Sequence, residues 1–127
     1  MTRKLDVALA TELGYELDWE YTRVAGEYGH KSFLAGVWGL YKDGKRIGEI
    51  PHYSTDGNAM LELERELHQR GYAVNISFYH LSTRKRFYCV CVYEDDNKII
   101  AKVDADTMPE AVALAAYHAL TGKEWTP

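Results

Sequence analysis

Apolar side chains recur every three or four residues in three stretches of the chain, which is the pattern of a helix with one buried face: residues 3–14, 55–70 and 108–120. Three consecutive capping side chains, Ser54, Thr55 and Asp56, precede the second stretch. Gly71 follows it and suits a left-handed helix end. Thr107 opens a Thr-x-x-Glu capping box before the third stretch, which is rich in alanine. The pattern therefore predicts three helices.

Between the second and third helices, apolar and polar residues alternate as they do in strands. Two polar turns divide this region into three strands, at 73–79, 87–93 and 98–105. The middle strand is apolar on both faces, which is typical of a strand with a layer on each side. Residues 15–21 also alternate and are followed by a loop, and Asp43-Gly44 marks the turn of a hairpin over 36–50.

These elements predict one α+β domain over residues 1–127, built as a three-layer α-β-α sandwich. An antiparallel meander sheet lies between helices in residues 51–122, and an extra N-terminal helix (3–14) and hairpin precede it. Double-stranded-RNA-binding domains share the order helix, three strands, helix, but place both helices on one face. The net charge of −4 and pI near 5.7 argue against that class and against nucleic acid in general.

Composition narrows the setting further. No apolar run approaches the ~20 residues of a membrane helix, and Asp6 and Glu12 interrupt any apolar signal core, so we expect a cytoplasmic protein without membrane contact. Ten tyrosines and three tryptophans stand against three phenylalanines. Such polar-tipped aromatics favour interfaces. We expect a homodimer or larger homo-oligomer in which the exposed edge of the 36–50 hairpin pairs with another copy.

Catalytic and metal-binding patterns are missing from the sequence. The glycines of the 36–50 hairpin do not form a phosphate loop, and no nucleophile lies at a recognisable spacing from a base. The histidines share no metal-ligand spacing (His30, His52, His68, His80 and His118). Cys89 and Cys91 lie two apart on one strand face, which suits buried structural thiols rather than a disulfide. The predictions are no enzyme, no cofactor and no metal.

Two helix starts carry a resemblance to a known family. The runs YSTD at 53–56 and ADTMPEA at 105–111, with Leu-Gly-Tyr at 13–15, resemble the phage ABA sandwich domain of small phage and prophage proteins. The likeness covers residues 3–15 and 50–122 and leaves 16–49 unmatched. It implies an α-β-α sandwich in a host-cell cytoplasm, without an established enzymatic role. Some small phage proteins of similar size and α/β build act against host immunity, so we expect a non-enzymatic binding protein that sequesters a nucleotide signal or binds a host defence protein.

A structural or interaction protein with no defence role is the alternative. If the ligand is a small nucleotide, cations must meet its phosphates and aromatic faces its base. The basic turn 84–86 supplies the cations, with Tyr88 next in the same row on the strand that follows. Tryptophans of the unmatched half supply the aromatic faces. The candidate ligand-binding residues are Arg84, Arg86, Lys85, Tyr88, Trp19 and Trp38. A basic turn also serves simply to limit aggregation, and aromatic residues in a hairpin also serve to pack it onto the core.

Overall fold

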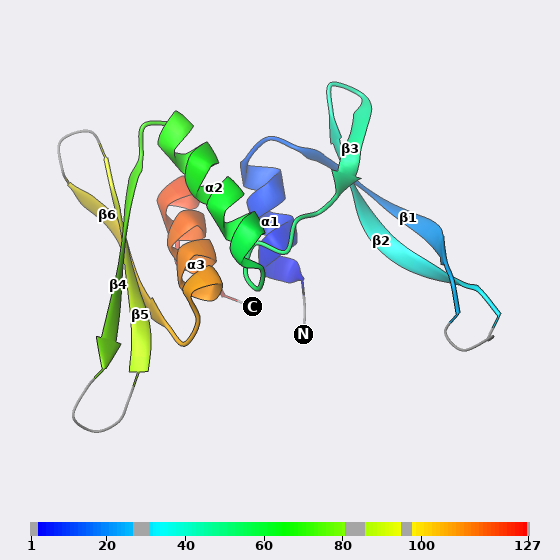
Figure 1. Ribbon diagram of the computed structural model, residues 1–127. Helices are drawn as coiled ribbons and strands as arrows, with labels where there is room; N and C mark the ends of the chain where they lie inside the picture. The colour runs from blue at the N-terminus through cyan, green and yellow to red at the C-terminus, as the bar shows by residue number, and fades with distance from the viewer. Residues whose placement is uncertain (1–2, 27–30, 81–85, 95–97, 127) are drawn as a thin grey trace.

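The computed structural model describes residues 3–26, 31–80, 86–94 and 98–126. Within this part of the chain lie three helices and two three-stranded antiparallel sheets (Figure 1). The helices are α1 (Lys4–Glu12), α2 (Gly57–Gln69) and α3 (Met108–Thr121). One sheet contains β1 (Glu16–Val24), β2 (Phe33–Lys42) and β3 (Lys45–Glu49), and the other contains β4 (Ala73–His80), β5 (Arg86–Tyr93) and β6 (Ile99–Ala105).

Two of the helices are capped by residues that the sequence predicts. Asp56 caps α2, since one of its carboxylate oxygens accepts the Ala59 amide at 3.1 Å. Thr107 caps α3 by accepting the Glu110 amide at 3.4 Å, and Gly122 ends that helix in the left-handed conformation. The main core lies between the helices and the β4–β6 sheet, and its completely buried large side chains are Leu9, Leu63, Leu67, Val90, Val92 and Val112.

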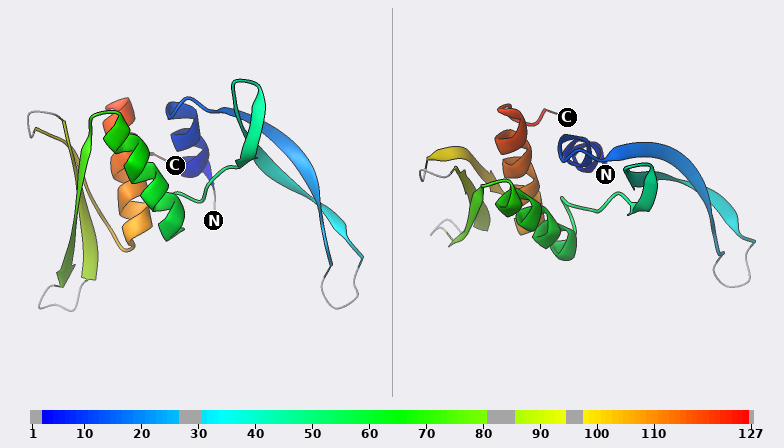
Figure 2. Two further views of the ribbon diagram at one scale, coloured as in Figure 1. Left: turned by 45° about the horizontal axis from the view of Figure 1, so that its top comes forward. Right: turned by 90° about the horizontal axis from the view of Figure 1, so that it is seen from above.

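The predicted class is confirmed, because this is an α+β fold in which helices pack against antiparallel sheets. The order of the layers differs from the expected sandwich. Both α2 and α3 lie on one face of the β4–β6 sheet, and α1 packs against α3 on the side away from that sheet (Figures 1 and 2). The sheet is therefore an outer layer. Among the described residues, no helix covers its second face.

The apolar second face of β5 is the signal that favoured two covering layers. Its residues are shielded by neighbours within the sheet instead. The ring of Tyr79 stacks on that of Phe87, with centroids 5.2 Å apart. Cys89, which lies between Ser77 and Asp104 in the strand register, is only 5% exposed. Small side chains in a central strand can thus be buried without a second layer.

The unmatched N-terminal half forms a separate arm, the sheet β1–β2–β3. β1 and β2 pair in continuous register from Glu16–Tyr41 to Val24–Phe33. The loop predicted over residues 24–32 is wrong at its first residue, because Val24 ends β1. β2 begins at Phe33, three residues before the predicted hairpin. The turn at Asp43-Gly44 is confirmed, and both of its residues have positive φ (53° and 78°) as a two-residue hairpin turn requires.

A polar clamp joins the arm to the helices. Asp6 on α1 is 2% exposed, accepts the Ser54 amide at 3.0 Å and lies 3.4 Å from the Arg3 guanidinium. Arg3 also donates to the carbonyls of Ile50 (2.7 Å) and Pro51 (2.8 Å). The start of α1 thus holds the segment that leaves β3 and enters α2.

Candidate functional site

The structure separates the residues that the sequence grouped into one nucleotide site. Arg84 and Lys85 lie outside the described residues. Arg86 is exposed at the start of β5, opposite His80. Tyr88, two residues on, is half-buried against Phe78, with ring centroids 5.0 Å apart. This pair lies at one end of the β4–β6 sheet.

Trp19 and Trp38 lie on the arm, directly opposite each other in the β1–β2 register. The helical layer stands between the arm and the β4–β6 sheet in every view (Figures 1 and 2). The hypothesis that these indoles stack a base held by Arg86 is therefore wrong. The physical reason is that the 36–50 hairpin pairs with β1 into its own sheet and does not fold over the end of β5.

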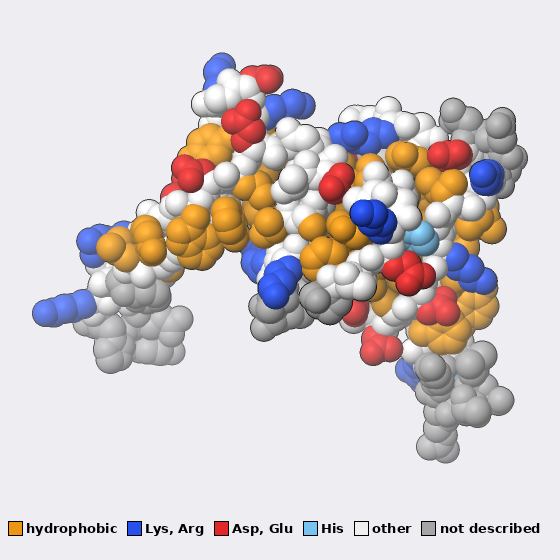
Figure 3. Space-filling model, turned by 180° about the vertical axis from the view of Figure 1, so that it is seen from behind, with side chains coloured by type: hydrophobic (Ala, Val, Ile, Leu, Met, Phe, Trp, Pro, Cys, Tyr) orange, Lys and Arg blue, Asp and Glu red, His pale blue; other side chains and the backbone are white. Residues whose placement is uncertain are grey.

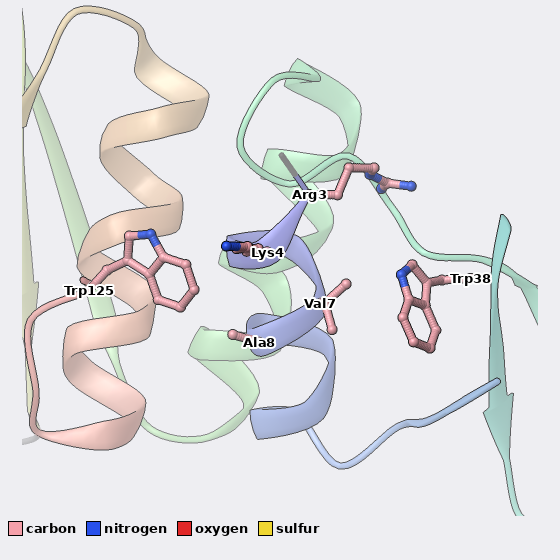
Figure 4. A pocket seen from close by; sticks show the side chains of 6 residues that line it. All are labelled: Arg3, Lys4, Val7, Ala8, Trp38 and Trp125. Atoms are coloured by element: carbon pink, nitrogen blue, oxygen red, sulfur yellow. The ribbon is translucent and has the colours of Figure 1, made fainter. Parts of the chain in front are cut away.

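Trp38 instead meets α1. A pocket of about 440 Å³ is lined by Arg3, Lys4, Val7, Ala8, Trp38 and Trp125. Figure 4 shows the two indoles on opposite sides of α1, with the apolar side chains of Val7 and Ala8 between them. The floor is apolar and the two cations stand near its N-terminal end. Such a surface can accept a flat or aliphatic group next to an anionic one.

Of the six pocket residues, sequence reasoning picked out Trp38 alone. It missed Trp125 because residues 123–127 read as a tail after the last helix. Trp125 is held in place by Tyr117 of α3, in an edge-on contact with ring centroids 5.0 Å apart. A tryptophan so close to a helix end was the available signal. Its ring can return onto that helix, which is what the structure shows.

An aromatic row continues from the pocket along the arm. Trp38 contacts Trp19 edge-on, with ring centroids 5.2 Å apart, and Trp19 contacts Tyr21 edge-on, with ring centroids 6.4 Å apart. Further out, Leu34 lies opposite Arg23 on the same face. The exposed fractions are 48% for Trp19, 69% for Tyr21 and 60% for Leu34. Figure 3 shows hydrophobic side chains in a line along the arm. We call Trp38, Trp19, Tyr21 and Leu34 the arm row.

Two glycines of β2 determine how the side chains of β1 lie. A Cβ at Gly36 would stand 2.1 Å from the Trp19 indole, so the ring crosses β2 only because residue 36 is glycine. On the other face, a Cβ at Gly39 would stand 2.7 Å from the Glu20 carboxylate. Glycine inside a strand often marks such a close approach. Both side chains of β1 therefore lean across β2 and away from the free edge.

Glu20 reaches two partners by crossing Gly39. Its carboxylate accepts from the Tyr41 hydroxyl and from Arg46 Nε, each at 2.6 Å. The Tyr41 hydrogen bond, then the Arg46 hydrogen bond, lower the pKa of Glu20, and the Glu20 hydrogen bond raises the pKa of Tyr41. The carboxylate is thus fixed over the middle of the sheet. This is a structural arrangement, since all three groups are occupied by one another.

Among the residues that the structure describes, the remaining chemical groups do not form a second site. Tyr15 donates to Glu66 at 2.7 Å, and this bond raises the pKa of the Tyr15 hydroxyl to about 12. Burial, followed by a hydrogen bond with Asp104, raises the pKa of the Cys89 thiol to about 11, which makes it a poor nucleophile. Within the described ranges, no three His, Cys, Asp or Glu side chains are placed to hold a metal ion. Nor is any helix there both long enough and apolar enough to cross a membrane.

No family model matches the chain, and searches of curated proteins and of solved structures returned no match.

Proposed function

We propose that this is a non-enzymatic binding protein that holds a partner protein on the arm row and the adjoining α1 pocket. The observation that carries the proposal is the exposure of Trp19, Tyr21 and Leu34 on an arm that extends away from the core (Figure 3). Large aromatic side chains contribute most of the binding energy at protein interfaces. A contiguous exposed apolar surface commonly marks such an interface.

The arm row is also held in shape before any partner arrives. Trp19 is wedged over Gly36 and between Trp38 and Tyr21, so its ring has little freedom to lose on binding. An interface whose aromatic side chains are already ordered avoids about 0.5–1.5 kcal/mol of entropy cost for each immobilised side chain. Gly36 is what lets the Trp19 ring lie in this ordered position. Such ordering of an exposed side chain supports a binding role for the arm row.

The setting that we propose is phage or prophage counter-defence, with a host defence protein as the partner. The resemblance to phage ABA sandwich proteins supports this setting, and both runs that carry it, 53–56 and 105–111, stand at helix starts in the structure. A structural or interaction protein without a role in defence would use the same surface. The identity of the partner separates the two.

The test compares the double variant Trp19→Ala/Tyr21→Ala with a matched control, Ile99→Ala. Ile99 is a similarly exposed apolar residue, but it lies on the β4–β6 sheet beyond the helices. Tagged protein is expressed in a host that carries the defence system, and copurified proteins are identified by mass spectrometry. We expect the wild type and the control to retain a partner that the double variant loses, at an unchanged melting temperature. Equal recovery of the partner by all three proteins would contradict the proposal.

A second candidate is a small anionic aromatic ligand, such as a nucleotide, in the α1 pocket. Lys4 beside the indoles of Trp38 and Trp125 favours it, because cations meet phosphates and indole faces stack on bases. Mass spectrometry of small molecules released by heat would detect it. We expect Lys4→Glu to lose such a ligand and Lys45→Glu, an equal charge change at the β2–β3 turn, to retain it.

Binding of duplex RNA is the remaining alternative. The order α2, β4–β6, α3, with both helices on one face, is shared with double-stranded-RNA-binding domains. The polar face of α2 is acidic, however, with Glu62, Glu64 and Glu66, and the net charge is −4. Phosphate binding needs the opposite sign. A steep loss of duplex RNA affinity with added salt would favour this class over the proposal above.

A further inference from the structure

β1 presents a long open edge. It is nine residues long and lies at the margin of the sheet order β1-β2-β3. In the part of the chain that the structure describes, β2 is its one strand neighbour. An unpaired edge offers a row of backbone amides and carbonyls to any strand that can align with it. Natural proteins often block such an edge with charged side chains, above all lysine, with proline or with a bulge. β1 contains no lysine, proline or bulge, and its charged residues are Glu16, Asp18, Glu20 and Arg23.

The direction of the free backbone groups follows from one hydrogen bond. The Ile50 amide donates to the Trp38 carbonyl at 3.0 Å, so the backbone groups of Trp38 face β3. Trp19, which is opposite Trp38, therefore belongs to a non-hydrogen-bonded pair, and its own amide and carbonyl point away from β2. Every second residue of β1 does the same. The outward-facing residues are Leu17, Trp19, Tyr21 and Arg23.

Two large or charged side chains near the middle of this edge are held away from it. Trp19 leans over Gly36 and Glu20 leans over Gly39, both toward the centre of the sheet. Tyr41 and Arg46 hold the Glu20 carboxylate there. The opposite margin of the same sheet is less suited to pairing, because β3 has five residues and begins with Lys45 and Arg46.

Two copies of β1 fit together in an antiparallel pair. Outward-facing residues must meet outward-facing residues, so the odd-numbered positions of one copy lie opposite odd-numbered positions of the other. Opposed residues in a sheet share a face. The arm rows of both copies therefore fall on one face of the combined sheet, and the acidic residues of both fall on the other.

Charge disfavours some of the possible two-fold registers. An axis at Trp19 sets Asp18 opposite Glu20, and an axis at Glu20 sets the two Glu20 residues opposite each other. An axis at Tyr21 opposes no carboxylates, since Glu20 then faces the uncharged Thr22. It also sets Arg23 opposite the uncharged Trp19. Residues 18–24 of each copy pair in this register, over about 24 Å.

We propose that the protein forms a two-fold dimer through β1, with Tyr21 on the axis, which joins the two arms into one six-stranded sheet. The pairing is isologous and therefore closes at two copies. Its consequence for the proposed partner surface is that the two arm rows form one continuous aromatic face. The dimer itself rests on the edge of β1 and needs no ligand.

Light scattering of the wild type in micromolar solution should give twice the 14.5 kDa of the chain. Tyr21→Lys sets two like charges opposite each other on the axis, so we expect the dissociation constant of the dimer to rise at least about tenfold. Leu34→Lys is the matched control. It makes the same kind of change on the same face, but on β2 and away from the edge. We expect it to leave the dimer intact.

The control also distinguishes edge pairing from stacking of two arm rows face to face, because stacking would be broken equally by both variants. A wild-type mass of 14.5 kDa, or equal effects of Tyr21→Lys and Leu34→Lys, overturns the proposal. Circular dichroism of each variant checks that the fold is retained. Tyr21 and Leu34 are both exposed, so neither change disturbs the core.

Cross-linking tests the register without relying on loss of association. In the proposed dimer, Tyr21→Cys brings two cysteines together as a directly opposed pair with Cα atoms about 5.5 Å apart, within disulfide range. Arg23→Cys leaves its two copies about 14 Å apart, four strand residues from each other. We expect oxidation to link Tyr21→Cys into dimers and to leave Arg23→Cys and the wild type unlinked. The reverse pattern overturns the register.

The dimer and the partner interaction fail separately. If the wild type dimerises but Trp19→Ala/Tyr21→Ala still copurifies with a partner, the proposed function is wrong and the dimer stands. If the wild type is a monomer and the double variant loses a partner that the wild type retains, the dimer is wrong and the proposed function stands.

Discussion

The helical half of the molecule and the arm are stabilised in different ways. In the helical half, side chains from α1, α2, α3 and the β4–β6 sheet bury one another completely, as Leu9, Leu63 and Val112 illustrate. Among the described residues of the arm, Leu40 is the one large apolar side chain that is buried. The rest of the arm is held by the strand ladder and by cross-strand contacts such as Trp19–Trp38.

The difference shows what each half is suited to do. A core of close-packed apolar side chains provides stability, because burial contributes about 25 cal/mol for each Å² removed from water. The arm, in which Leu40 is the one described large apolar side chain that is buried, gains little stability in this way. Its large aromatics stay exposed to solvent. Sequence substitutions should therefore affect folding in one half and association in the other.

The largest expected difference is in the stability lost when one of two leucines is replaced. Leu67→Ala on α2 removes a completely buried side chain and should lower the free energy of unfolding by about 3–5 kcal/mol. Leu34→Ala on the arm removes an exposed one and should change it by less than about 0.5 kcal/mol. Chemical denaturation of both variants measures this. Similar losses in the two would mean that the arm shares the stability of the core.

The second-largest loss of stability is expected at the polar clamp that joins the arm to the helices. Asp6→Ala leaves the part-buried Ser54 amide without its acceptor and Arg3 without its carboxylate, so we expect a loss of about 2–3 kcal/mol. Asp6→Asn keeps an acceptor for Ser54 and should lose less. Limited proteolysis should then cut residues 50–56 faster in the alanine variant. Unchanged cleavage and stability would show that α1 does not hold this segment.

A substitution within the arm should have a smaller effect. Gly36→Ala forces the Trp19 indole away, since the new Cβ would overlap it, and should cost about 1–2 kcal/mol. Near-ultraviolet circular dichroism should report the lost Trp19–Trp38 contact. Gly48→Ala on β3 is the control, because its Cβ would meet nothing within 4 Å. If the control shows the same spectral change, the space above Gly36 is not what positions Trp19.

The smallest effect concerns pH. The pKa of Tyr15 is raised from 10.0 to about 12, mainly by its hydrogen bond to Glu66, so folding favours the neutral hydroxyl. Its contribution is complete below pH 10 and is lost as the pH rises through about 12. We expect Tyr15→Phe to be less stable than the wild type by about 0.5–1.5 kcal/mol at neutral pH, and the difference to shrink above about pH 10. Denaturation midpoints across that range measure it, and a constant difference would contradict the assignment.

Much of the fold could be predicted because its signals are local. The caps at Asp56 and Thr107, the turn at Asp43-Gly44 and the alternation in 87–93 each depend on residues near one another in the chain. The candidate site could not be predicted in the same way. Trp38 and Trp125 line one pocket from opposite ends of the sequence, and neither has a local pattern that points to α1.

The amino-acid sequence by itself determined where helices and most strands begin and end, because capping hydrogen bonds and the periods of apolar residues act within a few positions. The tertiary structure alone decided three further matters. It placed both α2 and α3 on one side of the β4–β6 sheet, paired residues 22–24 with 33–35, and set Trp19 apart from Arg86. These depend on which surfaces bury one another across long separations in the chain. A side chain such as Cys89 is buried equally well by a helix or by its strand neighbours, so its apolar character cannot say which of them covers it.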